Sequence, residues 1–76
     1  MGYRFSPAKL RAARGRSGLS QNAVARRAAG FEVDALRNWE QGGTAPKGAA
    51  LLELADILEV DPRELFDEYD LEAAVR

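Results

Sequence analysis

The side chains of this chain that could carry out chemistry are carboxylates, guanidiniums, amines and amides, because its 76 residues include no histidine and no cysteine. Histidine is the commonest general base and metal ligand, and cysteine supplies thiolates for nucleophilic and metal chemistry. The adjacent acids Asp67 and Glu68 could form a carboxylate pair, but no nucleophile or metal cluster accompanies them. We therefore expect no enzyme, no cofactor, no metal site and no small-molecule substrate.

Basic side chains are concentrated in the first part of the chain. Residues 1–47 contain nine basic and three acidic residues, a net charge of +6, whereas residues 48–76 contain two basic and nine acidic residues, a net charge of −7. A basic surface attracts the phosphates of nucleic acids, and an acidic one helps to keep a protein in solution. The total charge of −1 therefore does not exclude a polyanionic partner. A solvated surface can also vary in charge without any functional meaning.

The length of the chain predicts one small domain that buries roughly 60% of the surface its unfolded form exposes. Because no disulfide can form, this domain depends on apolar packing. No apolar stretch is long enough to span a bilayer, and residues 1–7 lack the apolar core of a signal peptide. These features predict a cytoplasmic protein that does not contact a membrane.

Helix-capping signals and apolar spacing predict five short helices and no strand. Serine precedes the first two helices as an N-cap, and Gly30 is expected to end the second in the left-handed conformation. Asp61, followed by proline and then glutamate, has the pattern of a capping box that opens the last helix. The predicted helices span residues 7–16, 21–29, about 32–41, 48–58 and a short segment that opens at residue 61.

The apolar residues of these helices fall on single faces, which are expected to meet in one core. Trp39 lies on such a face, so we assign it to the core rather than to a stacking surface for a single nucleic-acid strand. The small residues of the second helix permit a close approach to its neighbours. The predicted inward residues are Val24, Ala25, Ala28, Val33, Leu36, Trp39, Glu40, Leu51, Leu54, Ala55, Leu58, Leu65 and Phe66.

The second and third predicted helices are joined by a short turn with a glycine, which is typical of a helix-turn-helix motif. The stretch LRAARGRSGLSQNAVARRAAGFEVDALRNWEQG, followed by PKGAALLELADILEVDPRELF, resembles the phage-repressor and Cro-like (Xre-type) DNA-binding domains. The resemblance implies an all-α, compact five-helix lambda-repressor-like domain in residues 1–66, with the helix-turn-helix at helices 2 and 3. Residues 67–76 are expected to form an acidic tail, either a short helix or a frayed end.

The resemblance also implies where DNA is bound. It places the first half of the third helix in the major groove, and the start of the second helix and the loop after the third helix against phosphates. An asparagine amide can pair with both hydrogen-bonding groups of adenine, and an arginine can reach guanine or a phosphate. The expected base-reading residues are Asn38, Arg37, Asp34, Val33 and Glu32, and the expected phosphate-binding residues are Gln21, Thr44, Lys47 and Arg26.

Two acids on the expected reading helix are unusual, because a carboxylate only accepts hydrogen bonds and repels phosphates. Glu32 occupies the N-cap position and is expected to satisfy the free amides of the first turn. Asp34 is expected either to reject wrong base sequences or to favour the helix N-terminus. The resemblance further pairs Arg14 with Glu40 as a partly buried ion pair that ties the first helix to the end of the third.

The predicted function is sequence-specific binding of double-stranded DNA by a small transcriptional regulator. The alternative is a protein-interaction module, such as an antitoxin-like partner, that uses the acidic C-terminal half to meet a basic protein. A weak homodimer is also expected, because apolar residues are left over beyond or at the edge of the last helix. These residues are Phe66, Tyr69, Leu71 and Val75.

Overall fold

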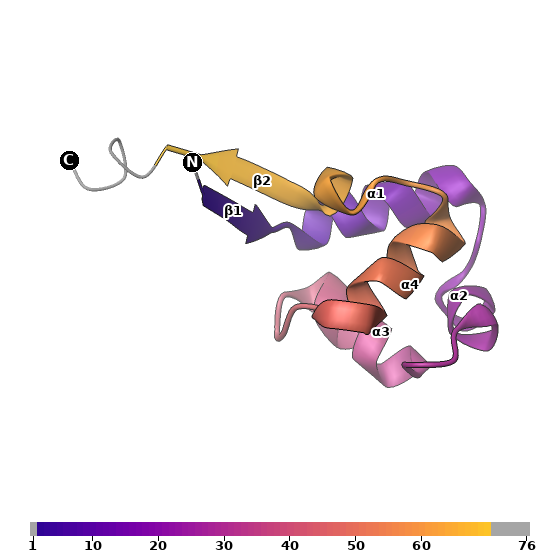
Figure 1. Cartoon of the computed structure of the whole chain (residues 1–76). Helices are drawn as coiled ribbons and strands as arrows, with labels where there is room; N and C mark the ends of the chain where they lie inside the picture. The colour runs from indigo at the N-terminus through magenta and orange to yellow at the C-terminus, as the bar shows by residue number, and fades with distance from the viewer. Residues whose placement is uncertain (1, 71–76) are drawn as a thin grey trace.

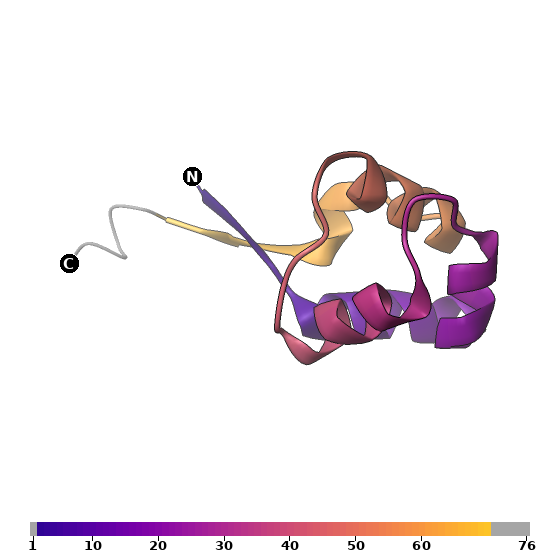
Figure 2. The same cartoon turned by 90° about the horizontal axis from the view of Figure 1, so that it is seen from below.

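A computed structural model of the chain describes residues 2–70. The helices form one body, and two strands form a ribbon that extends from it (Figures 1 and 2). The elements in chain order are β1 (Gly2–Phe5), α1 (Pro7–Ser17), α2 (Gln21–Arg27), α3 (Val33–Gln41), α4 (Gly48–Leu58), the 3₁₀ helix η1 (Pro62–Leu65) and β2 (Phe66–Tyr69). None of the helices in the described part is long and apolar enough to cross a membrane.

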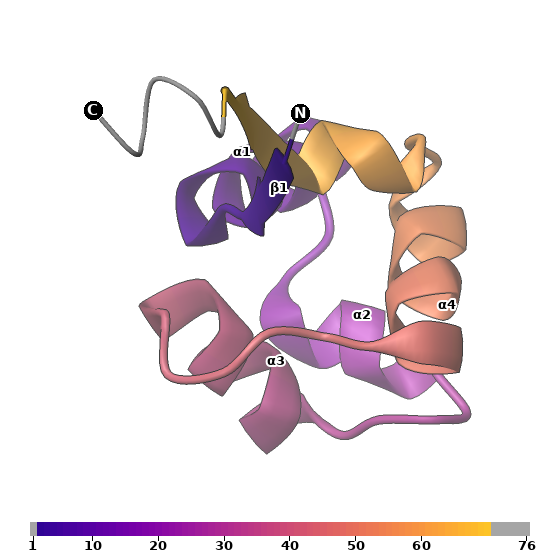
Figure 3. The same cartoon turned by 60° about the vertical axis from the view of Figure 1, so that its left-hand side comes forward.

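The four α-helices are arranged so that α2 and α3 lie on a different side of the body from the ribbon (Figures 1 and 3). Helix α3 packs against both α1 and α2, and α4 packs against α1 and α2. Helices α1 and α4 therefore both pack against the helix-turn-helix pair.

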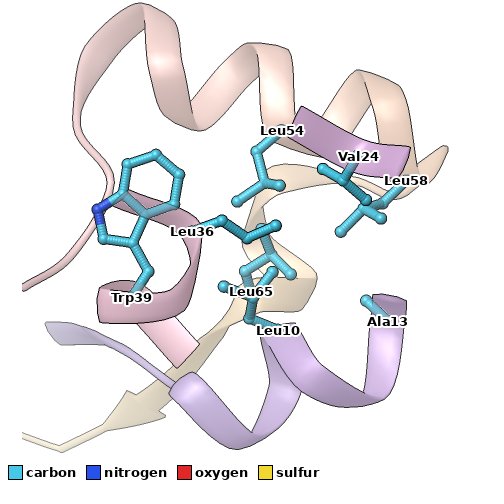
Figure 4. Close-up of a cluster of buried hydrophobic side chains, with 8 residues drawn as sticks. All are labelled: Leu10, Ala13, Val24, Leu36, Trp39, Leu54, Leu58 and Leu65. Carbon is cyan, nitrogen blue, oxygen red and sulfur yellow. The ribbon is translucent and has the colours of Figure 1, made fainter. Parts of the chain in front are cut away.

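A single apolar core joins these elements, with side chains from all four α-helices and from η1 (Figure 4). Trp39 is 7% exposed, and its ring meets the ring of Phe31 edge-on at a centroid distance of 5.0 Å. The assignment of Trp39 to the core is therefore confirmed. The core consists of Leu10, Ala13, Val24, Leu36, Trp39, Leu54, Leu58 and Leu65.

The predicted N-caps of the first two helices are confirmed. The Ser6 hydroxyl accepts a hydrogen bond from the Lys9 amide at 3.1 Å, and the Ser20 hydroxyl accepts one from the Ala23 amide at 3.0 Å. Each bond satisfies an amide that has no partner within its helix. Helix α4 spans the predicted residues 48–58.

The predicted end of the second helix is wrong. Helix α2 stops at Arg27, and Ala28 is already extended, with φ −91° and ψ 141°. Gly30 does not adopt the left-handed conformation, which among the described glycines occurs at Gly18, Gly42 and Gly48. The reason is a long-range contact: the amides of Ala29 and Gly30, which follow the helix, donate hydrogen bonds to the Glu53 carboxylate.

The predicted fifth helix is also wrong, so the fold is mostly helical rather than all-α. The capping box at Asp61 is present, but it opens only η1, and Phe66 is extended. The chain continues as β2, which pairs antiparallel with β1 so that Gly2 faces Tyr69 and Phe5 faces Phe66. Each strand has four residues. Such short segments carry too little alternation to identify a strand from sequence.

Side chains on both faces stabilise the ribbon. The rings of Phe5 and Phe66 meet edge-on at 5.8 Å, and the Arg4 guanidinium lies 5.2 Å from the centre of the Tyr69 ring. The Lys9 amine donates to the Phe66 carbonyl at 2.7 Å and joins the ribbon to α1. The acidic tail predicted from residue 67 therefore starts within a strand, and its residues 71–76, including Leu71 and Val75, lie outside the described part.

The end of α4 provides a test of backbone strain. Glu59 terminates this helix with φ 57°, and it is the one described residue other than glycine with a positive φ. A side chain in the left-handed region costs about 1 to 2 kcal/mol, which glycine avoids. We expect Glu59→Gly to raise the free energy of urea-induced unfolding by about 1 kcal/mol. Glu59→Ala keeps the Cβ atom and should give no comparable gain; equal gains would trace the effect to charge instead.

Candidate nucleic-acid interface

The helix-turn-helix pair consists of α2 and α3, which pack against each other. Residues 28–32 connect them, and within this turn the Phe31 side chain is half-buried against the core. Helix α3 buries Leu36, Trp39 and Glu40. This leaves its opposite face, with four of the five expected base-reading residues, open to solvent. The fifth, Val33, is half-buried at the start of the helix.

The acids on this face differ in their contacts. The Asp34 carboxylate lies 3.3 Å from the Arg37 guanidinium one turn later, and the two side chains are 89% and 50% exposed. This exposed pair adds little to stability, but it partly compensates the negative charge of Asp34. The capping bond expected from Glu32 is absent, although Glu32 does occupy the N-cap position of α3. Glutamate is one methylene longer than the preferred cap aspartate, so its carboxylate is poorly placed for the first-turn amides.

Asn38 is connected to the loop that follows α3. Its side-chain amide nitrogen donates to the Thr44 hydroxyl at 2.9 Å. A Cβ atom at Gly43 would collide with the Asn38 carboxamide, so this position of the Asn38 side chain depends on glycine there. One bond thus joins an expected base-reading residue to an expected phosphate-binding residue, a contact that the sequence did not predict.

The other expected phosphate-binding residues lie on α2 and in the loop before α4. The Gln21 amide nitrogen, at the start of α2, donates to the Glu40 carboxylate at 3.2 Å. Arg26 and Lys47 are exposed, and Lys47 precedes α4 as a backbone N-cap without a capping bond from its side chain. Gln21 therefore has a structural contact as well as its expected contact with DNA.

The structure brings Arg14 and Glu40 together. The Arg14 Nε and Nη2 atoms donate to the two carboxylate oxygens at 2.6 and 3.1 Å, and the Arg14 and Glu40 side chains are 23% and 4% exposed. This hydrogen bond raises the pKa of Arg14 above its ordinary value, against the effect of burial and with a further contribution from the Glu40 charge. Arg11 also donates to the backbone carbonyl of Glu40. Two arginines of α1 thus hold the end of α3.

Glu53 is a residue of this region that sequence analysis missed. Its side chain reaches from α4 to the turn between α2 and α3, where its two carboxylate oxygens accept hydrogen bonds from the amides of Ala29, at 2.7 Å, and Gly30, at 2.8 Å. These bonds, with Ala29 contributing more, hold the pKa of Glu53 below its ordinary value. A glutamate on an amphipathic helix gives no sequence signal of such a distant partner.

Comparison with protein families identifies the architecture. A family model described as "Helix-turn-helix domain" matches residues 8–68 of the chain. The chain belongs to this family. Searches among curated proteins and among solved structures give no match. Helix-turn-helix domains typically bind DNA by placing the second helix of the motif in the major groove, and they are typically non-catalytic.

The Arg14–Glu40 pair predicts an asymmetric effect of mutation. Arg14→Met leaves a carboxylate that is 4% exposed, whereas Glu40→Leu leaves a guanidinium that is 23% exposed and can turn to water. We expect Arg14→Met to lower the free energy of unfolding by about 3 kcal/mol, Glu40→Leu to cost less, and the double variant to recover much of the loss. Urea unfolding of all four proteins measures the coupling energy. Purely additive losses would contradict a direct interaction.

The Glu53 contact predicts a pH-dependent contribution to stability. Because its folded-state pKa is lowered, the contribution is present above the unfolded-state pKa, about 4.3 for glutamate, and is lost as pH falls through the folded-state pKa. We therefore expect the stability difference between wild type and Glu53→Gln to shrink as the pH is lowered from 6 to 3. Thermal unfolding across this range measures the difference. Asp56→Asn, on the same helix, should leave the contribution in place.

Proposed function

We propose that this protein binds double-stranded DNA sequence-specifically, as a small transcriptional regulator of the Xre type, with α3 in the major groove. The observation that carries the proposal is the solvent-facing side of α3 within a helix-turn-helix domain. The net charge of +6 in residues 1–47, which contain α1, α2, α3 and the following loop, supports it. A duplex carries closely spaced phosphates, so a basic half of the domain favours association.

Arg37 and Asn38 are the proposed base-reading residues at the centre of the interface. The amide nitrogen of asparagine has two hydrogens, so Asn38 can keep its bond to Thr44 while it donates the second hydrogen to adenine N7 and accepts from adenine N6. The Asp34 carboxylate beside Arg37 restricts where its guanidinium can lie and favours a guanine partner over a loose phosphate contact. Val33 and Glu32 complete this surface at the start of α3.

Phosphate contacts are proposed for residues before and after α3. Gln21 and Arg26 lie on α2, before α3 in the chain, and Thr44 and Lys47 lie in the loop between α3 and α4. Such contacts fix the orientation of the protein on the duplex without reading sequence. A weak homodimer on a palindromic site remains part of the proposal, because two copies would double both kinds of contact. The half-exposed Tyr3 on β1 offers apolar surface for such an association.

A binding selection from genomic fragments, followed by sequencing, tests the proposed function. Enrichment of a common short sequence would support specific recognition. Failure to enrich any duplex, together with a salt-sensitive complex with a basic protein, would favour the antitoxin-like interaction module instead. The selected sequence then serves as the operator in the experiments below.

Asn38→Ala is expected to reduce binding to the operator by about 1 to 3 kcal/mol and to relax the preference at one base pair. Thr44→Val should alter the preference at the same base pair, because it removes the oxygen that holds the Asn38 amide, and should also weaken binding to all sequences through the loss of its phosphate contact. Quantitative gel-shift or fluorescence titrations on operator and single-base variants measure these effects. Equal losses on operator and random DNA would remove Asn38 from base reading.

Lys47→Ala is expected to weaken binding to all sequences about equally and to reduce the slope of log affinity against log salt by about one. Binding titrations at several salt concentrations measure the slope. Arg63→Ala is the matched control, because Arg63 is an exposed basic residue on η1, outside the proposed interface. Equal slopes for wild type and Lys47→Ala would exclude a phosphate contact at this lysine.

A further inference from the structure

We propose that Glu53, which lies on α4 outside the helix-turn-helix motif, is a positioning residue for DNA recognition. Its carboxylate holds the turn between α2 and α3 and thereby sets the position of α3 in the major groove. This role rests on the proposed DNA binding, and the experiment below separates the two.

Both oxygens of the Glu53 carboxylate take part in the contact. Oε2 accepts from the Ala29 amide and Oε1 from the Gly30 amide, at 2.7 and 2.8 Å. Hydrogen bonds to a charged acceptor are shorter and stronger than those between neutral groups. A Cβ atom at Gly30 would lie 3.2 Å from Oε1, so glycine here provides room for the carboxylate rather than a left-handed backbone.

Helix α4, which carries Glu53, is anchored in the core. Leu54 and Ala55, the next two residues of α4, are 0% and 1% exposed, and Leu58 one turn later is 5% exposed. The turn that the carboxylate holds has no left-handed glycine to close α2, and α3 begins at Val33, three residues after Gly30. Loss of the contact would free the segment immediately before the reading helix. The end of α3 would remain fixed by Arg14 and Glu40.

A positioning role predicts a change in DNA affinity opposite to the one that the charge of Glu53 alone predicts. Removal of an acidic charge from a DNA-binding protein normally strengthens its attraction to phosphates. A positioning role predicts the reverse for Glu53→Gln on the operator, because a displaced α3 loses base contacts while the phosphate contacts persist. Asp56→Asn makes the same charge change at an exposed residue three positions along α4, and it serves as the matched control.

Operator and random duplexes are titrated with wild-type protein, Glu53→Gln and Asp56→Asn at neutral pH. We expect Glu53→Gln to bind the operator roughly tenfold more weakly, a loss comparable to one mismatched base pair, and to bind random DNA as tightly as wild type or more tightly. Asp56→Asn should lose no operator affinity. Amide hydrogen exchange should show faster exchange at Ala29 and Gly30 in Glu53→Gln, with the core amide of Leu10 on α1 still protected, which shows that the fold is retained.

Four outcomes would overturn the positioning role. Operator affinity of Glu53→Gln equal to that of wild type, or an equal loss on operator and random DNA, would remove the role and leave the proposed function standing. Unchanged exchange at Ala29 and Gly30 would show that the carboxylate does not hold the turn. Wild-type protein that binds no duplex DNA would overturn the proposed function, and the positioning role with it.

Discussion

The position of α3 depends on the contacts made by Glu40. Glu40 is 4% exposed, and its carboxylate receives hydrogen bonds from Arg14 and Gln21, while Arg11 binds the carbonyl of the same residue. A charge so well buried is tolerated only when its partners satisfy it. The first helix, the start of α2 and the end of α3 therefore meet at one residue. Their relative geometry follows from the need to satisfy that carboxylate.

Helix α3 is thus held at both ends by charged side chains from other helices. Arginines of α1 hold its C-terminal end, and Glu53 of α4 holds the turn before its N-terminal end. Between these points, Leu36 and Trp39 anchor it in the core. The outer face is left to Asp34, Arg37 and Asn38, and all three take part in side-chain hydrogen bonds that restrict their orientation. A small core can in this way present a well-defined surface to a ligand.

Much of the helical framework could be predicted because its signals are local. Ser6 and Ser20 mark helix starts, the i, i+3 and i+4 spacing of Leu36, Trp39 and Glu40 marks one buried face, and the motif itself was anticipated. The Arg14 and Glu40 pair was expected only from a family resemblance. The contacts of Asn38 with Thr44, and of Glu53 with the turn, were not anticipated, because exposed polar residues carry no periodicity that identifies a partner.

The sequence by itself determined the four α-helices, their inward faces and the basic half of the chain, since caps, apolar spacing and charge act over a few residues. Only the tertiary structure decided that Asp61 opens a single 3₁₀ turn, that residues 66–69 pair as a strand with residues 2–5, and that α2 stops at Arg27. Each depends on backbone groups finding partners far along the chain. The backbone groups of β1 pair with those of β2, which lies more than 60 residues later in the chain. The amides of Ala29 and Gly30 donate hydrogen bonds to the carboxylate of Glu53 on α4.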